Sequence, residues 1–112
     1  MAFVRMSAVL MRKGQSAPKT TLILQCVIDD DGRINEGDWF GWHKSEYFGA
    51  SYPFKYRDGV VQYDSSEPTS NIKTNLDERA IKVGQFFCWQ SMRSAQDRFD
   101  DTFRIENVHV IL

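Results

Sequence analysis

Residues 54–63 read FKYRDGVVQY and carry the strongest local structural signal in the chain. Asp58-Gly59 stands between two alternating runs, which is a strong signal of a β-hairpin with a two-residue type I′ turn, because both turn residues need a positive φ. The expected register pairs Arg57 with Val60, Tyr56 with Val61, and Phe54 with Tyr63. Aromatic and apolar side chains then share one face, and Lys55, Arg57 and Gln62 share the other. A shift of one residue would destroy this sorting, so the turn and the pattern agree.

Similar alternation recurs on both sides of the hairpin, whereas no window keeps the i, i+3, i+4, i+7 spacing of an amphipathic helix. We expect strands over residues 2–12, 19–28, 39–44, 85–93 and 102–112. A turn is expected over 13–18, a looser segment over 45–53, a long polar loop over 64–75 and one helical turn near 77–80. The chain is therefore predicted to be mainly β, a single domain over residues 1–112. Its expected form is a small closed or half-open antiparallel β-barrel of roughly six to eight strands, with at most one short helix.

The composition excludes several classes of protein. Fourteen basic and fifteen acidic side chains give a formal net charge of −1, which lacks the strong positive field of a duplex-binding protein. No run approaches the ~18 consecutive apolar residues that a membrane-spanning helix needs. The apolar run at residues 6–11 is shorter than the roughly 7–15 residues of a signal-peptide core. Cys26 and Cys88 sit in apolar runs and do not form a secreted disulfide framework, so we expect a cytoplasmic protein with no membrane partner.

One short pattern occurs twice in the chain. Ile34-x-x-Gly37-x-Trp39-Phe40-x-Trp42 is echoed by Ile81-x-x-Gly84-x-Phe86-Phe87-x-Trp89. The echo is compatible with a duplicated half-barrel. It is also compatible with two uses of a common turn, in which a glycine leads the chain into a strand.

Candidate metal and cofactor motifs are weak. Asp29-x-Asp31-Gly32 resembles the middle of a calcium-binding loop, but Val27 holds the first ligand position of that loop, so an acidic turn between strands explains it better. The other candidate metal ligands are Cys26, Cys88, His43 and His109. No two of them have the short sequence spacing that is typical of a zinc site. The chain carries no dinucleotide fingerprint, phosphate-binding loop or nucleophile elbow. We therefore predict no metal, no cofactor and no catalytic residue.

Aromatic content is the unusual feature, with eight Phe, four Tyr and three Trp. Large rings fill the core of a small barrel, and they also line ligand pockets and protein interfaces. Residues 46–52 read EYFGASY and carry three rings without strand alternation, which is typical of a recognition loop or of a loop that plugs the barrel end. The candidate ligand- or partner-binding residues are Trp39, Trp42, Tyr47, Phe48 and Tyr52.

We expect a non-catalytic binding or accessory domain that acts through protein or small-molecule contacts. The first alternative is a single-stranded nucleic-acid binder of the OB-like type, because residues 42–44 and 54–57 interleave aromatic and basic side chains. Nucleic acid is not the favoured partner, since the hairpin register puts Phe54 and Tyr56 on the face opposite Lys55 and Arg57, and the net charge is slightly negative. The second alternative is a small enzyme with a carboxylate-based site.

The C-terminal segment is apolar on both sides. Alternation assigns Phe103, Ile105 and Ile111 to one face, and Val108, Val110 and Leu112 to the other. Such a strand is prone to aggregate unless it is covered, either by the first strand of the same chain or by a second copy. We favour the second arrangement, a homodimer through the C-terminal strand.

Overall fold

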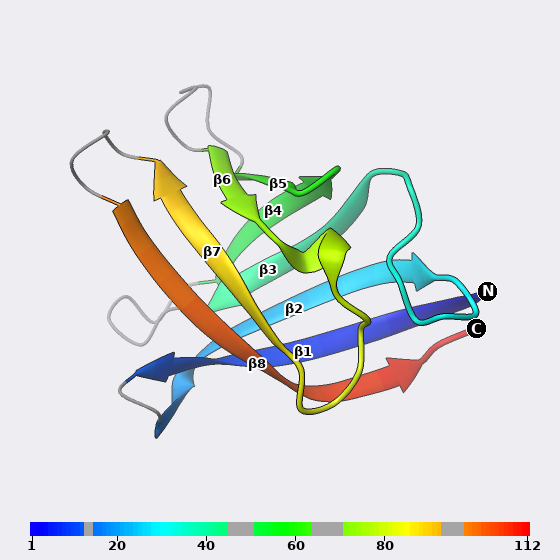
Figure 1. Ribbon diagram of the computed structural model, residues 1–112, viewed down its shortest axis with the longest axis horizontal. Coiled ribbons are helices and arrows are strands. Elements are labelled where there is room, and N and C mark those ends of the chain that lie inside the picture. The colour runs from blue at the N-terminus through cyan, green and yellow to red at the C-terminus, as the bar shows by residue number, and fades with distance from the viewer. Residues whose placement is uncertain (13–14, 45–50, 64–70, 93–97) are drawn as a thin grey trace.

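The computed structural model of the protein describes residues 1–12, 15–44, 51–63, 71–92 and 98–112. Eight antiparallel strands follow one another around a closed barrel (Figure 1). Their bounds are β1 Ala2–Arg12, β2 Gln15–Ile28, β3 Trp39–Lys44, β4 Ser51–Arg57, β5 Val60–Tyr63, β6 Asn71–Thr74, β7 Phe86–Met92 and β8 Arg98–Val110. A short 3-10 turn, η2 (Leu76–Glu78), follows β6. The predicted small antiparallel barrel is confirmed, in its closed form. Within the described ranges, no helix is long and apolar enough to cross a membrane.

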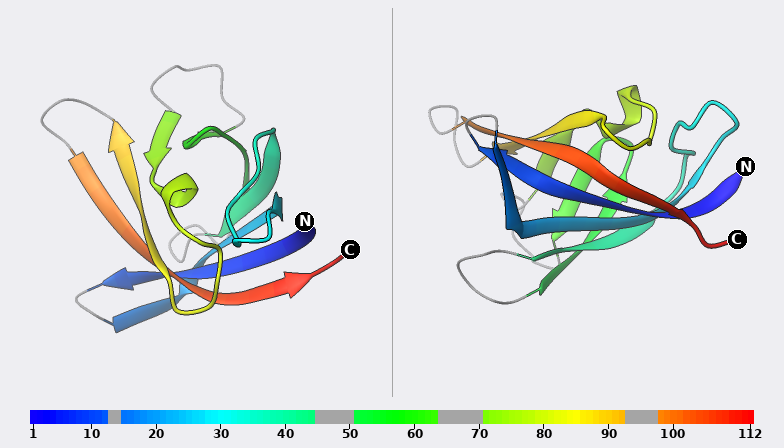
Figure 2. Two further views of the ribbon diagram at one scale, coloured as in Figure 1. Left: turned by 45° about the vertical axis from the view of Figure 1, so that its right-hand side comes forward. Right: turned by 90° about the horizontal axis from the view of Figure 1, so that it is seen from below.

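The barrel closes where β8 pairs with β1. The Phe3 backbone N–H donates to the Leu112 carbonyl at 3.1 Å, and the Ile111 N–H donates to the Phe3 carbonyl at 2.8 Å. Figure 2 shows the two termini side by side at this seam. Because β8 has neighbours on both sides within one chain, its backbone pairing needs no second copy. Val110, Ile111 and Leu112 are nevertheless exposed, and the homodimer stays a prediction.

The hairpin predicted over residues 54–63 is present. β4 and β5 pair in the expected register, and the turn residues Asp58 and Gly59 have φ values of 49° and 78°. Two successive positive φ angles are the mark of a type I′ turn. Phe54 and Tyr56 are buried, whereas Arg57 is exposed, as the alternation requires.

The core lies inside the barrel and is built from the inward positions of every strand. Gly41 is needed at one of these positions, because a Cβ there would lie 2.0 Å from the Ile23 carbonyl oxygen and 2.8 Å from the ring of Phe54. Phe54 is the cross-strand partner of Gly41, so its ring occupies the space that a side chain at 41 would fill. The fully or nearly buried apolar side chains are Val4, Met6, Ala8, Leu10, Leu22, Leu24, Cys26, Phe54, Tyr56, Val61, Leu76, Ile81, Phe87, Trp89, Phe103 and Ile105.

Several predicted boundaries were wrong, and the larger errors assigned strand residues to a loop. β2 begins at Gln15, inside the predicted turn; β4 begins at Ser51, inside the looser segment; and β8 begins at Arg98, four residues early. The largest error is β6, whose four residues lie within the predicted polar loop. β6 pairs with both β5 and β7, so its neighbours hold it in place although its own sequence gives only a weak signal.

A bulge corrects the predicted faces of the C-terminal strand. Ser7 pairs with Asn107 and Ala8 pairs with Ile105, which leaves an extra residue on β8. The extra residue reverses the alternation. Val108 therefore packs against the core on the same side as Ile105, and its predicted place on the opposite face was wrong.

The repeated aromatic pattern does not place its two copies alike. Trp39 packs against the core, whereas the corresponding Phe86 is 48% exposed. Trp42 lies on the outside, beside Ile23 and Pro53, whereas the corresponding Trp89 is buried. The duplicated half-barrel is therefore not supported, because equivalent rings face opposite sides of the wall.

Candidate binding surface

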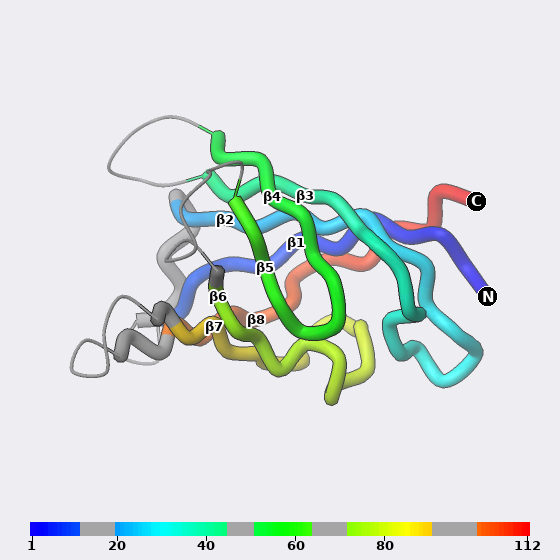
Figure 3. Tube along the Cα trace, turned by 90° about the horizontal axis from the view of Figure 1, so that it is seen from above, coloured from blue at the N-terminus to red at the C-terminus, as the bar shows by residue number. Residues whose placement is uncertain are grey.

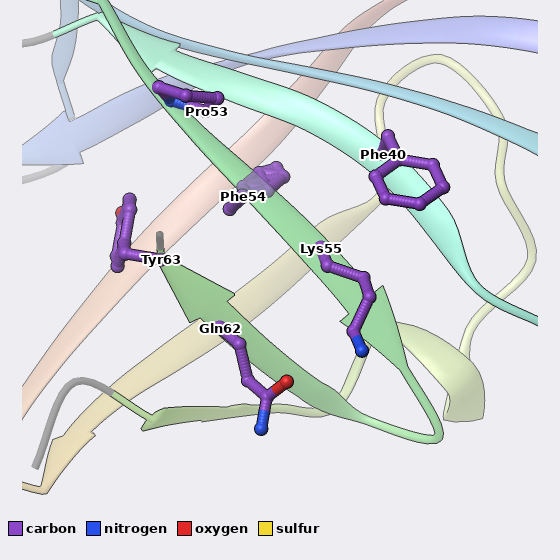
Figure 4. Close-up of a pocket in the computed structure, with 6 residues that line it drawn as sticks. All are labelled: Phe40, Pro53, Phe54, Lys55, Gln62 and Tyr63. Carbon is purple, nitrogen blue, oxygen red and sulfur yellow. The ribbon is translucent and has the colours of Figure 1, made fainter. Parts of the chain in front are cut away.

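The outer face of β3, β4 and β5 carries exposed apolar surface. Phe40 is 61% exposed, and Pro53 beside it is also exposed. Together with Lys55 and Gln62 they border a shallow depression of about 340 Å³, which Phe54 and Tyr63 also line (Figure 4). Large apolar side chains gathered around one depression mark a recognition site more often than isolated ones do. We call the outward side chains Phe40, Trp42, Pro53, Lys55 and Gln62 the Phe40 face.

The strand register aligns the centre of this face in one row across the wall. Phe40 on β3 is the direct cross-strand partner of Lys55 on β4, and Lys55 is the direct partner of Gln62 on β5. Directly opposed residues have Cβ atoms about 4.5–5.5 Å apart. The tube in Figure 3 shows the three strands in succession along one side of the barrel. An aromatic ring, an ammonium group and an amide therefore stand next to one another on one surface.

The same row continues on the other side of Phe40. Gln25 on β2 is the partner of Phe40, and Arg5 on β1 is the partner of Gln25. With its amide oriented to satisfy both groups, Gln25 accepts hydrogen bonds at Oε1 from Arg5 Nη2 at 2.9 Å and from Arg5 Nε at 3.1 Å. This pairing leaves the amide nitrogen of Gln25 as a donor beside the Phe40 ring.

Charge is distributed unevenly between the barrel wall and its connections. Strands β1 to β7 contain no Asp or Glu, and β3 to β6 carry Lys44, Lys55, Arg57 and Lys73. Arg57 is paired, with its Nε 3.5 Å from Asp38 Oδ1 and 3.9 Å from Asp58 Oδ2. Among the described residues, no carboxylate lies within 4.0 Å of the three lysines. The outer wall around the Phe40 face is therefore locally positive although the chain is slightly negative.

A second group of functional side chains packs inside the barrel. The His43 ring lies 5.8 Å from the Trp89 ring and 6.4 Å from the Phe103 ring, measured between centroids. Its Nδ1 is 3.4 Å from the Tyr63 hydroxyl. Burial lowers the pKa of His43, and the negative charge of Asp101 opposes this shift. Aromatic rings surround the imidazole as in a core, and this environment favours its neutral form.

The five predicted binding residues do not come together. Trp39 is half-buried against the core, and its Nε1 donates to the Asn35 carbonyl at 2.8 Å, so it supports the fold. Trp42 belongs to the Phe40 face, and Tyr52 is 38% exposed at the position paired with His43. Tyr47 and Phe48 lie outside the described residues.

Sequence reasoning missed Phe40, Lys55 and Gln62 as one group. The pattern showed that Lys55 and Gln62 point away from the core, but it could not pair β3 with β4. The available signal was alternation within residues 39–44, which places Phe40 and Trp42 on the same face of that strand.

The acidic turn is a turn and shows no ligand-binding arrangement. Asp29 Oδ1 accepts hydrogen bonds from the backbone N–H groups of Asp31 and Arg33, both at 2.9 Å. A carboxylate used in this way caps the local backbone. In the described part of the chain, no group of three His, Cys, Asp or Glu side chains is placed to hold a metal ion, and Cys26 and Cys88 are free thiols.

Comparison with known proteins adds no assignment, since no family model, no curated protein and no solved structure matches the chain.

Proposed function

We propose that the protein is a non-catalytic binding domain whose partner presents a planar group and a negative charge to the Phe40 face. The observation that carries the proposal is the row of Phe40, Lys55 and Gln62 across three neighbouring strands. The exposed ring offers a stacking surface, the ammonium group offers charge, and the amide offers both a donor and an acceptor.

The distribution of charge supports a binding role over a carboxylate-based enzyme. In the described strands, Asp and Glu occur only in β8, and the surface with the exposed apolar depression carries none. Among the described residues, His43 and Tyr63 are two titratable groups within hydrogen-bond distance of each other, but they pack against core rings. A substrate needs access to a catalytic pair, and the Phe40 face has no such pair.

A small aromatic anion tests the proposed surface directly. We expect naphthalene-2-sulfonate to shift the backbone amide NMR signals of residues 40–42, 53–55 and 62. Phe40→Ser should abolish the shifts, because the ring supplies the contact area. Phe86→Ser is the matched control, since Phe86 is an exposed phenylalanine on the outer side of β7. Shifts confined to another part of the barrel, or unchanged in Phe40→Ser, would contradict the proposal.

A further inference from the structure

Phe40 has the properties of a stacking platform for a nucleobase. It stands at an outward position near the middle of the sheet formed by β2 to β5, and more than half of its surface is open to solvent. Trp42 lies on the same side of the same strand, two residues further on. Side chains two residues apart on a strand are separated by about 6.5–7 Å, so a chain extended along β3 can meet both rings in succession. Stacking on aromatic side chains is the main base contact in single-strand recognition.

Positive charges flank this platform at intervals that suit a phosphate backbone. Lys55 is opposite Phe40, and Lys44 follows Trp42 on the outer side of β3. Lys73 lies on β6, opposite Val60, and continues the positive surface beyond β5. Lys73 is two strands away from Lys55 and two residues further along, and with about 4.8 Å between strands and 3.3 Å per residue this separates the two lysines by roughly 12 Å. The surface therefore offers Lys55 and Lys73 on the β4 side of the stacking rings and Lys44 at the end of β3, with no acidic residue in β3 to β6.

Gln62 supplies a hydrogen-bonding group beside the ring and the lysine. Its side chain is exposed beside Lys55, and its amide can donate to or accept from a base edge. An acidic peptide would use the lysines but would leave the exposed Phe40 ring and the half-buried Trp42 ring without a specific partner. A duplex would present phosphates while its bases stay stacked inside. Of these three occupants, an unpaired strand is the one that uses ring, charge and amide together.

We propose, building on the binding function above, that the Phe40 face and Lys44 and Lys73 beside it bind a single strand of nucleic acid. Bases stack on Phe40 and Trp42, and phosphates contact the three lysines. The net charge of −1 does not oppose this assignment, because only three of the fifteen acidic residues lie in strands, all three in β8, and none lies in β3 to β6. The cross-strand register brings the basic and aromatic groups to one face, which alternation within the β4–β5 hairpin does not do.

Fluorescence anisotropy of a labelled oligothymidylate tests the proposal by measuring its affinity for the protein. A length of about 12 nucleotides is within the range of single-strand sites. Phe40→Leu keeps an apolar side chain but removes the ring, and should weaken binding between about 5-fold and 100-fold. Phe40→Tyr should restore binding. Lys55→Gln should weaken binding and reduce the slope of log K against log salt by about 0.7, because one phosphate contact is lost. Phe86→Leu and Lys82→Gln are matched controls outside the surface, and both should bind like the wild type.

Several outcomes would overturn the assignment. Absence of oligonucleotide binding at low salt would do so, as would equal affinity in Phe40→Leu and the wild type. Tighter binding of a duplex of the same length than of the single strand would show that charge alone drives binding. The same conclusion would follow if oligoglutamate bound as tightly as the oligothymidylate and its affinity did not depend on Phe40. The naphthalene-2-sulfonate experiment distinguishes failure of the nucleic-acid assignment from failure of the binding function. If that anion binds at Phe40 and the oligonucleotide does not, the binding function stands and the nucleic-acid assignment fails.

Discussion

His43 Nδ1 lies 3.4 Å from the Tyr63 hydroxyl inside the barrel. The two residues come from β3 and β5, which are not adjacent in the sheet, so this contact crosses the interior. Trp89 packs against both rings. The arrangement places a half-buried titratable group against the core rings, and the stability of the barrel should therefore depend on pH.

The first prediction concerns this pH dependence. Burial lowers the pKa of His43 from its usual value of 6.5, so the unfolded chain takes up a proton more readily than the folded chain. The contribution of His43 to stability is constant above about pH 6.5 and is lost as the pH falls below it, by at most about 1.4 kcal/mol per pH unit. Urea unfolding at pH 7 and pH 5 measures the loss. His43→Gln should shrink it, whereas His109→Gln, at an exposed strand position, should not.

The second prediction concerns the hairpin turn. Gly59 has a φ of 78°, and a Cβ there would approach the Thr74 carbonyl oxygen to 3.2 Å. Gly59→Val should lower the free energy of unfolding by about 1–3 kcal/mol, because a β-branched residue resists a positive φ. Gly59→Asn should cost less, since asparagine tolerates this conformation. Equal unfolding midpoints for the wild type and Gly59→Val would show that the type I′ turn does not form.

The third prediction separates backbone strain from close packing at two glycines. Gly41→Ala should prevent folding or lower the unfolding free energy by more than about 3 kcal/mol, because its Cβ would overlap the Ile23 carbonyl at 2.0 Å. Gly84→Ala meets no atom within 4 Å and is strained only by a φ of 90°, so its cost should be about 1–2 kcal/mol. Thermal unfolding followed by circular dichroism compares the two variants. A smaller cost at Gly41 than at Gly84 would contradict the close packing of β2, β3 and β4.

The fourth prediction concerns two tyrosine hydroxyls. The Tyr56 hydroxyl is buried without a hydrogen-bond partner among the described residues, and burial raises the pKa of Tyr56 to about 12. The nearby Gly59 backbone offsets part of that rise without making a hydrogen bond of ordinary geometry. Tyr56→Phe should therefore leave the free energy of unfolding unchanged or raise it by about 1 kcal/mol.

Tyr63→Phe is the matched comparison for this pair, because its hydroxyl contacts His43. It should lower the free energy of unfolding by about 0.5–1.5 kcal/mol. Chemical denaturation of both variants at pH 7 gives the two differences. If Tyr56→Phe proved the more damaging of the two, the buried hydroxyl would have a partner after all.

Local features of the fold were predictable because local chemistry determines them. The Asp58-Gly59 turn and the alternation around it gave the register of β4 and β5 without knowledge of any other strand. β6 was missed because it has only four residues, in which Ile72 and Thr74 alternate with Asn71 and Lys73, and so short an alternation is a weak strand signal. Pairing with β5 and β7 holds this strand in place. The extra residue in β8 was missed for a similar reason, since a bulge is defined against the partner strand.

The candidate site was only half predictable. Trp42 was selected as an aromatic residue in a strand, but alternation alone could not tell that Trp39 faces the core. The pairing of Phe40 with Lys55 joins two consecutive strands that residues 45–50 separate in the sequence, and it is fixed when β3 and β4 align. Sequence periodicity reports which side of its own strand a residue occupies. It does not report which residues of the next strand stand beside it.

The seam between β1 and β8 has a consequence for how the protein is made. During synthesis β1 emerges from the ribosome about a hundred residues before the strand that covers its free side. Until then the growing sheet carries an open edge at β1 and a second one at its most recently formed strand, and both can pair with other nascent chains. Contacts of such long sequence separation also form slowly. Ribosome stalling or truncation before residue 98 should therefore yield aggregates, even though the finished barrel has no open edge.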